Sequence, residues 1–222
     1  MDKNLIIVVG HYGSGKTEFS INYAVKSKET FKKVNLVDLD IVNPYFRSRE
    51  KREMLENMDI SIMASNLTNK NLDIPALSPS INGAINDIKA RTIIDAGGDP
   101  VGAKALSRYN NIIRNKDYDM FLVVNANRQD TQNLEKIISY YEKIEATSRL
   151  KITGLINNTH TLKSTSIEDV MRGAELVKKV SEKLKIPVKY HTAIKKIADE
   201  INKNKSMEVF PIELYMREEW MY

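Results

Sequence analysis

Short apolar segments recur along the chain, separated by longer segments in which apolar residues return every three or four positions. The short segments cover residues 5–9, 34–39, 92–94, 120–124 and 152–156. Their apolar residues do not alternate regularly with polar ones, which is typical of parallel strands that helices cover on both faces. The pattern therefore predicts five buried parallel strands.

The longer segments predict helices at about 16–28, 101–114, 130–147, 165–185 and 193–203. Thr165-Ser166-Ile167-Glu168 has the form of a capping box and supports the fourth of these helices. Strands and helices that alternate in this way form right-handed βαβ units. We therefore expect a doubly wound, mostly parallel α/β sheet with helices on both faces. No change in composition divides residues 1–222, so we expect a single domain.

A phosphate-binding motif directly follows the first predicted strand. The sequence Gly10-His11-Tyr12-Gly13-Ser14-Gly15-Lys16-Thr17 matches the Walker A pattern in full, between a predicted strand and a predicted helix. Backbone N–H groups of such a loop surround phosphate oxygens, and the start of the helix adds positive potential. We expect Lys16 to contact the β- and γ-phosphates and Thr17 to bind Mg²⁺. All eight residues are thus expected to bind nucleotide.

Two acidic residues end the second predicted strand. Asp38 and Asp40 point to the same side if the strand is still extended there. A carboxylate near a Mg²⁺-bound triphosphate could orient or deprotonate the attacking group, or hold a metal-bound water. We expect this role for Asp40 before Asp38. The alternative is that Asp40 only caps a turn formed by Asn43-Pro44.

The third predicted strand ends in a further acidic residue. Asp95 has the position of a Walker B carboxylate, which holds Mg²⁺. Gly98 completes the sequence Asp-x-x-Gly, in which a backbone N–H can reach the γ-phosphate and order the loop. The alternative is a simple turn formed by Gly97 and Gly98.

Two segments could bind the nucleotide base. Asn127-Arg128-Gln129-Asp130 is similar to the guanine-binding Asn-Lys-x-Asp of GTPases, but Arg replaces Lys and the segment follows one strand too early. The next strand leads into Asn157 and Asn158, whose amides can donate and accept hydrogen bonds at a purine edge. We expect Asn157 near adenine and Asn158 as the second choice. The alternative places both in a turn.

Together these motifs carry a resemblance to a known family. Residues 10–17, 37–40, 93–98 and 154–157 resemble, in this order, the nucleotide-binding motifs of the MinD/ParA/CobQ/CobB group of SIMIBI P-loop proteins. The resemblance spans most of the chain and includes residues 186–188, which are similar to the family's short strand near its base site. Residues 38–50 resemble its cobyrinic-acid-synthase-like branch.

The resemblance implies ATP and Mg²⁺ as ligands and assigns roles to single residues. Lys16 and Thr17 would contact phosphate and Mg²⁺, Asp40 would lie near the attacking water and the metal, Asp95 would lie at the metal, and Asn157 would contact adenine. Lys16 and Asp40 would be the catalytic residues.

His11 departs from the family pattern. Partition and cell-division ATPases have a signature lysine at this place, and it reaches the phosphates of the other subunit in a nucleotide-sandwich dimer. A histidine is shorter and has no permanent charge. The case for a lysine-dependent dimer is therefore weak, whereas a homodimer of another kind stays open.

Two functions fit the resemblance. The first is a regulatory or maturation ATPase whose hydrolysis switches its interaction with a protein partner. The alternative is a ligase or kinase-like enzyme, similar to dethiobiotin synthetase or cobyrinic acid synthase, that transfers the γ-phosphate to a small acidic substrate. Arg47, Arg49 and the polar residues 65–80 could line its substrate pocket, since arginines pair well with carboxylates. Otherwise the arginines lie on the surface.

The amino-acid composition excludes several other classes of function. The chain has no cysteine, which excludes disulfides, thiolate metal sites and protein-ligated iron–sulfur clusters within it. A net charge of +5, from 34 basic and 29 acidic residues, is spread along the helices, whereas nucleic-acid binding predicts basic residues gathered on one face. No apolar run near the start is long enough for a signal peptide or a membrane span. We expect a cytoplasmic protein that binds neither membrane nor nucleic acid.

The C-terminal residues show a helical pattern. Ile212, Tyr215, Met216 and Trp220 would form one stripe of a helix. We expect this stripe to pack on the domain or on a sister subunit.

Overall fold

Parallel strands form one sheet at the centre of the computed structural model, which describes residues 2–40, 48–64, 78–98, 100–205 and 207–217. In these residues the sheet has eight strands in the order β3-β2-β4-β1-β5-β6-β7-β8, and every neighbouring pair is parallel. The strands are β1 (Leu5–Gly10), β2 (Val34–Leu39), β3 (Ile60–Ala64), β4 (Arg91–Ala96), β5 (Tyr118–Val124), β6 (Gly154–Asn157), β7 (Val188–Ile194) and β8 (Val209–Ile212). The predicted doubly wound α/β sheet is confirmed.

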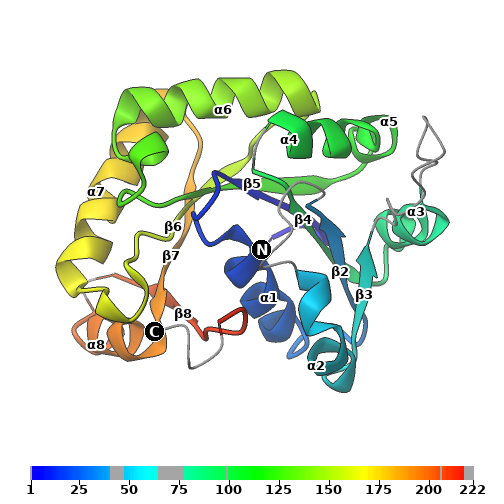
Figure 1. The fold of residues 1–222 in the computed structure, drawn as a ribbon, viewed down its shortest axis with the longest axis horizontal. Helices are drawn as coiled ribbons and strands as arrows, with labels where there is room; N and C mark the ends of the chain where they lie inside the picture. The colour runs from blue at the N-terminus through cyan, green and yellow to red at the C-terminus, as the bar shows by residue number, and fades with distance from the viewer. Residues whose placement is uncertain (1, 41–47, 65–77, 99, 206, 218–222) are drawn as a thin grey trace.

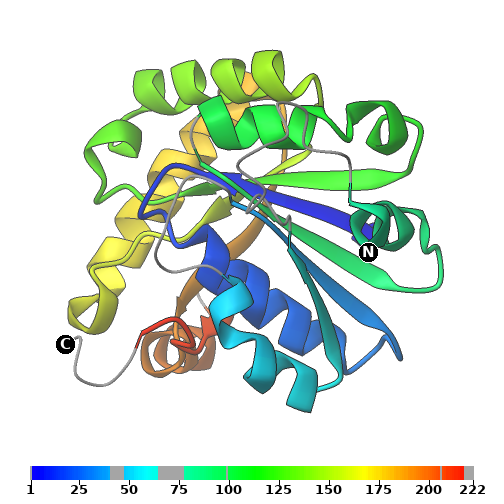
Figure 2. The ribbon, with the colours of Figure 1, turned by 45° about the vertical axis from the view of Figure 1, so that its right-hand side comes forward.

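Helices cover both faces of this sheet (Figures 1 and 2). The helices are α1 (Lys16–Ser27), α2 (Arg52–Asn57), α3 (Pro79–Asn86), α4 (Pro100–Ser107), α5 (Asn110–Ile113), α6 (Leu134–Ser148), α7 (Ile167–Leu184) and α8 (Lys195–Lys203). Apolar side chains of α3 to α7 pack in one cluster on one face, and those of α1 and α2 pack in a second cluster on the other. The central strands are therefore buried on both sides.

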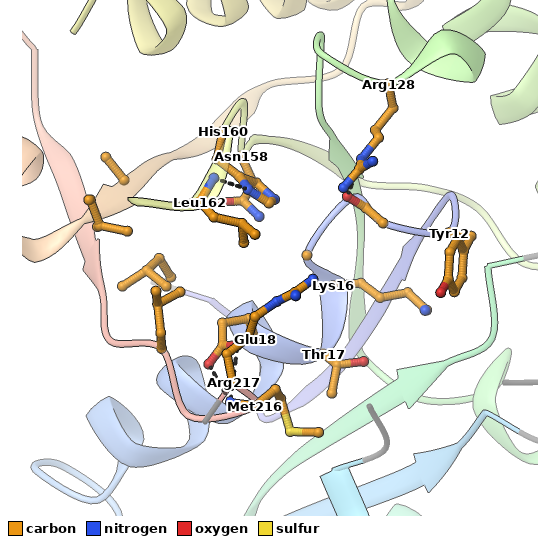
Figure 3. A pocket seen from close by; sticks show the side chains of 16 residues that line it. Tyr12, Lys16, Thr17, Glu18, Arg128, Asn158, His160, Leu162, Met216 and Arg217 are labelled. Carbon is orange, nitrogen blue, oxygen red and sulfur yellow. Dashed lines mark hydrogen bonds between the residues drawn. The ribbon is translucent and has the colours of Figure 1, made fainter. Parts of the chain in front are cut away.

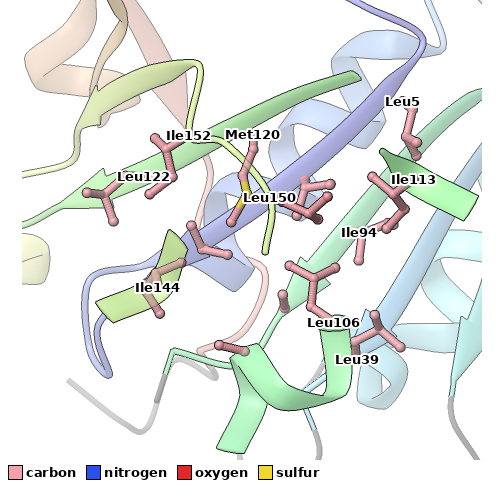
Figure 4. Packing of buried hydrophobic residues seen from close by; sticks show 14 of the residues in the cluster. Leu5, Leu39, Ile94, Leu106, Ile113, Met120, Leu122, Ile144, Leu150 and Ile152 are labelled. Atoms are coloured by element: carbon pink, nitrogen blue, oxygen red, sulfur yellow. The ribbon is translucent and has the colours of Figure 1, made fainter. Parts of the chain in front are cut away.

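Burial on both faces explains the apolar pattern of the sequence. All residues of β1, β2 and β4 are buried. Figure 4 shows Ile94 of β4 and Met120 of β5 near Leu106 of α4 and Ile144 of α6, all within one cluster. Because β1, β2 and β4 are parallel neighbours, their carboxyl ends lie together at one edge of the sheet.

The two edge strands, β3 and β8, were not predicted. In β3, Ile60 and Ile62 are buried while Ser61 between them is exposed, so the strand alternates instead of being continuously apolar. In β8, Pro211 lacks a backbone N–H and suits only an edge. Edge strands lack the uniform burial on which the prediction relied.

Helix predictions need three corrections. The segment 101–114 forms two short helices, α4 and α5, instead of one. The N-cap of α7 is Ser166, which forms a capping box with Asp169, so the predicted box is displaced by one residue. Short helices α2 and α3 were not predicted.

The predicted C-terminal helix is also wrong in its described part. Ile212 ends β8, and the chain then continues without helix to Arg217. Ile212 and Met216 are nevertheless buried in the cluster beneath α1, so their packing on the domain is confirmed. Trp220 lies outside the described residues. In the described part of the chain, no helix has the length and apolar character needed to cross a membrane.

Candidate functional site

The phosphate-binding motif forms a tight loop between β1 and α1. Gly13 and Gly15 have φ values of 75° and 84°, in the left-handed region that favours glycine. The Ser14 N–H donates to the His11 carbonyl at 3.0 Å and closes the turn. Gly15, the N-cap of α1, has no side chain with which to cap the first turn. Backbone N–H groups at this helix start are thus left for an anion, as the motif predicts.

Lys16 and Asp40 form a buried ion pair under the loop. Lys16 Nζ lies 3.2 Å from Asp40 Oδ2, and both side chains are about 6% exposed. Thr17, the next residue of α1, is also buried. The structure therefore brings together the loop lysine, the hydroxyl and the acid after β2 that the sequence singled out.

Asp95 is an acidic residue of the site that is buried without a normal hydrogen-bond partner among the described residues. It is fully buried, and neither carboxylate oxygen has a hydrogen bond of normal geometry within the described residues. Burial raises the pKa of Asp95 to about 7; Lys16 and the nearby Thr17 hydroxyl oppose the rise, while Asp38 and Asp40 add to it. Two buried acceptor oxygens without a donor are suited to a cation or to the water of one.

These residues fit a magnesium ion that shares its ligands with phosphate. In the described ranges, no group of three or more His, Cys, Asp or Glu side chains could hold a metal ion by itself. Mg²⁺ at a triphosphate usually keeps several waters and needs only one or two carboxylates. Thr17 and Asp95 supply a hydroxyl and a carboxylate of this kind, with Asp40 close to Lys16.

Asp38 has a structural role. Its side chain is fully buried and accepts Arg49 Nε at 2.8 Å and Nη2 at 3.1 Å, and also the Asp40 N–H at 3.0 Å. Arg49 additionally donates to the Asp40 carbonyl. Arg49 is thus neither a free carboxylate-binding group nor a plain surface residue. Arg47, Asn43-Pro44 and residues 65–77 lie outside the described residues.

Gly98 and His11 lie on one side of the phosphate loop. A β-carbon at Gly98 would collide with the Gly10 carbonyl oxygen, so the Asp-x-x-Gly segment touches the end of β1. The Gly98 carbonyl accepts a hydrogen bond from the Tyr140 hydroxyl of α6. His11 Nε2 lies 3.4 Å from Asp130, and its ring meets the Tyr140 ring edge-on at 5.6 Å. His11 therefore faces α6.

A cavity of about 330 Å³ opens on the other side of the loop (Figure 3). Its phosphate-loop end is lined by Tyr12, Gly13, Gly15, Lys16, Thr17 and Glu18. The rest is lined by Arg128, Asn158, His160, Leu162, Ala193, Ile194, Ile212, Leu214, Met216 and Arg217. One end is therefore polar and continuous with the loop, while the other is largely apolar and suits a flat ring.

The two asparagines after β6 face different ways. The Asn157 amide nitrogen donates to the Val170 carbonyl of α7 at 2.9 Å, and its oxygen accepts from the Thr159 hydroxyl, so both ends of the amide are engaged within the protein. Asn158 donates to the Ser14 carbonyl at 2.8 Å, accepts from Thr192, and lines the cavity. The Asn157 side chain thus faces α7 and does not line the cavity, and its contact with adenine stays a prediction. Asn158 braces the phosphate loop.

His160 is a cavity residue that the sequence interpretation missed. The Leu162 N–H donates to His160 Nδ1 at 3.3 Å, which leaves the ring proton of the neutral form on Nε2. Nε2 is buried without a partner in the described residues. Burial, and then Arg128 and Arg217, lower the pKa of His160 to about 4, so it is a neutral donor near pH 7. The sequence did contain a signal for His160: it lies two residues after Asn158, and residues two apart on an extended segment point to the same side.

The segment after β8 forms one wall of the cavity and was also missed. Glu18 accepts the backbone N–H groups of Tyr215 and Met216. Asn22 both donates to and accepts from the Glu213 backbone at 2.8 Å. Burial raises the pKa of Glu18 to about 7, although these backbone donors oppose the rise. Two side chains of α1 thus hold the segment that presents Leu214 to the cavity.

Asn127 does not line the cavity, and its side chain faces α7. Asn127 donates to Asp169 of α7 at 3.2 Å and accepts from Arg172. Its neighbour Arg128 donates to the Gly13 carbonyl at 3.0 Å and reaches the cavity. This arrangement agrees with the reading that the segment follows one strand too early for base recognition.

No protein-family model and no curated protein matches the chain. Solved structures match its fold. FtsY from Mycoplasma mycoides is 20% identical, with 84% of this chain and 58% of that chain covered and a TM-score of 0.57. The signal recognition particle receptor FtsY from Elizabethkingia anophelis in complex with GDP is 19% identical, with 86% and 57% covered and a TM-score of 0.55. FlhF complexed with GMPPNP and Mg²⁺ is 16% identical, with 84% and 64% covered and a TM-score of 0.51.

At such low identity these matches show the fold alone. The chain spans less than two thirds of each of these solved chains. The chain is therefore similar in fold to these FtsY and FlhF structures. The narrower resemblance to the cobyrinic-acid-synthase-like branch has no support among these structures.

Proposed function

We propose that the chain is a Mg²⁺-dependent ATPase that acts as a nucleotide-dependent switch for a protein partner. The observation that supports this most directly is the cluster of Lys16, Thr17, Asp40 and Asp95 beneath a complete Walker A loop. Such a cluster contains a charge for phosphate, a hydroxyl and a carboxylate for Mg²⁺, and an acid near the attacking group.

Each residue has a chemical role in this proposal. The Lys16 ammonium has three N–H donors, so it can keep its contact with Asp40 and donate to a phosphate oxygen as well. Asp40 orients the attacking water and accepts its proton. Mg²⁺, held by Thr17 and Asp95, would supply positive charge for the β- and γ-phosphate oxygens. The protein's own contribution is the fixed position of these groups.

The polar groups of the first cavity favour adenine over guanine. Guanine presents two N–H donors on its pairing edge and is best bound by a free carboxylate, whereas adenine presents an acceptor nitrogen there. Among the described lining residues the only carboxylate is Glu18, which is used by Tyr215 and Met216. His160 contributes an N–H donor instead. We therefore propose ATP, although the similar structures contain GDP or GMPPNP.

A connection between the nucleotide site and α6 supports the role of a switch. Gly98, three residues after Asp95, is tied to α6 through the hydroxyl of Tyr140. A segment that contacts the γ-phosphate would transmit its loss to the helix bonded to it. The group-transfer alternative loses one of its supports, since Arg49 is already paired with Asp38.

The test is ATP turnover by the wild type and Lys16→Ala, each with and without Mg²⁺. Without Lys16 the transferring phosphoryl group loses a positioned charge, and we expect turnover to fall by about a hundredfold or more. Lys178→Ala, at an exposed position of α7, is the control and should match the wild type.

Unchanged turnover in Lys16→Ala, or turnover without Mg²⁺, would contradict the proposal. Phosphate release without any acceptor supports hydrolysis. Turnover that starts only when a carboxylic acid is added supports the group-transfer alternative instead.

A further inference from the structure

A second cavity, of about 300 Å³, lies on the His11 side of the phosphate loop. Its lining consists of His11, Gly98, Asp130, Lys136, Ser139, Tyr140, Lys143 and Ile144. None of these residues lines the first cavity. The loop therefore separates two cavities with different linings.

The second cavity is lined mainly by polar and cationic side chains of α6. Lys136, Ser139, Tyr140 and Lys143 have the spacing of one helical face. Lys143 has no hydrogen bond or ion pair with the described part of the chain. Lys136 donates to the Gln129 carbonyl at 2.6 Å and keeps two further N–H donors. Such a lining favours an anion.

The position of this cavity relates it to the γ-phosphate end of the site. His11 belongs to the phosphate loop, and Gly98 belongs to the segment that the sequence assigns to the γ-phosphate. Gly98 touches the Gly10 carbonyl and is bonded to Tyr140, so both loops meet at the cavity. The apolar end of the first cavity, suited to the base, lies on the opposite side of the loop.

We propose that the second cavity binds an oxyanion that takes part in the reaction, through Lys136 and Lys143. This inference rests on the proposed ATPase function. The oxyanion is either the inorganic phosphate that hydrolysis releases or the carboxylate of a small acceptor. Asp130, 3.4 Å from His11 Nε2, holds the imidazole at the cavity wall.

Both sources give a balanced reaction. In hydrolysis a water oxygen bonds to the γ-phosphorus while the bond to the ADP oxygen breaks, and the water proton passes to Asp40 and then to solvent. With an acceptor, a carboxylate oxygen replaces water and the products are an acyl phosphate and ADP. The acceptor carboxylate would lie beside the γ-phosphate before transfer, whereas inorganic phosphate, which contains the former γ-phosphorus, would occupy the cavity after it has separated from ADP.

Equilibrium dialysis of radiolabelled inorganic phosphate against the full chain tests this site. Saturating Mg²⁺ and ADP occupy the phosphate loop itself. We compare the wild type with Lys136→Gln/Lys143→Gln and with the control Lys178→Gln/Lys179→Gln, which makes the same change of charge on α7. Loss of two cationic contacts should weaken phosphate binding about tenfold in the first variant and leave the control unchanged.

A second arm distinguishes the two sources of the oxyanion. Succinate is added as a competing carboxylate, and hydroxylamine traps any acyl phosphate formed from ATP. Lysine-dependent phosphate binding without competition or trapping supports product phosphate. Lysine-dependent competition with hydroxamate formation supports an acceptor carboxylate. If Mg²⁺ and ADP bind but neither anion shows lysine-dependent binding, the inference is overturned. If ADP itself does not bind the wild type, the ATPase proposal has failed instead.

Discussion

The two cavities beside the phosphate loop differ in chemistry, although adjacent loop residues, His11 and Tyr12, line them. Tyr12 lines a cavity whose far wall is largely apolar and in which His160 presents an N–H donor. His11 lines a cavity of lysines, hydroxyls and one acid. A single turn of backbone thus separates a surface suited to a flat ring from one suited to an anion. Base recognition and phosphate chemistry should therefore respond to different substitutions.

The largest effect is expected for substitution of Asp95. This residue lines neither cavity and belongs to the phosphate and Mg²⁺ site between them. A carboxyl whose pKa rises from 3.8 to about 7 on folding makes the folded state less stable as pH rises through that range. Asp95→Asn removes this penalty, so we expect the free energy of unfolding without nucleotide to increase by up to about 4 kcal/mol at pH 8. Urea unfolding measures this change.

At pH 4 the carboxyl is almost fully protonated in the folded state and close to half protonated in the unfolded state, so the difference should fall to about 0.6 kcal/mol there. A stabilisation of equal size at pH 4 and pH 8 would show that charge burial is not its cause. The same variant should gain less stability from Mg²⁺ and ATP than the wild type.

His160→Asp tests which base the first cavity, on the Tyr12 side, prefers. It replaces a donor by a carboxylate that can accept the N–H groups of guanine. We expect the ratio of GTP to ATP affinity to rise about tenfold, measured by calorimetry on one preparation. The ratio is internal to the variant, so a loss of stability does not disturb it. His160→Asn is the control, and an unchanged ratio would contradict the donor role of His160.

Leu214→Ala should affect nucleotide binding at the first cavity without affecting phosphate binding at the second. Removing apolar surface from the wall of the first cavity should weaken ADP and ATP binding alike, about fivefold. Phosphate binding on the His11 side should not change, whereas Lys143→Gln should show the reverse behaviour. Calorimetry and dialysis on both variants measure the two affinities. Equal losses of both ligands in either variant would mean that the cavities are not independent.

The smallest effect is expected for Tyr140→Phe, which removes the hydroxyl that donates to the Gly98 carbonyl. One neutral hydrogen bond contributes about 1 kcal/mol. We expect turnover to fall about threefold, with little change in ATP affinity. The neighbouring Tyr141→Phe is the control, because Tyr141 lines neither cavity. An equal effect of both variants would contradict a specific link from Gly98 to α6.

Much of the sheet could be predicted because its central strands are buried on both faces. That burial produces continuous apolar runs, as in β1 and β4. The edge strands β3 and β8 could not be predicted in this way, since one alternates and the other contains Pro211. An edge strand forms because it pairs with a strand that is distant in the sequence, and the local pattern of apolar residues does not reveal that pairing.

The site could be predicted where it depends on local sequence. The Walker A spacing and the acids after the strands led to Lys16, Asp40 and Asp95. The choice between Asn157 and Asn158 depended on which side each faces at a strand end, and α7 decides that through Val170. The wall formed after β8 depended on contacts with α1 that only the folded chain shows.

The contact between Glu18 and Tyr215 joins residues that are 197 positions apart. Because closing so large a loop costs chain entropy, we expect this contact to form late in folding. The first cavity therefore gains its last wall only after the sheet has been completed through β8. A nucleotide that uses this wall binds only chains in which folding is finished, and by mass action it stabilises those chains over partly folded ones. The same ligand would then act as a checkpoint for folding as well as a substrate.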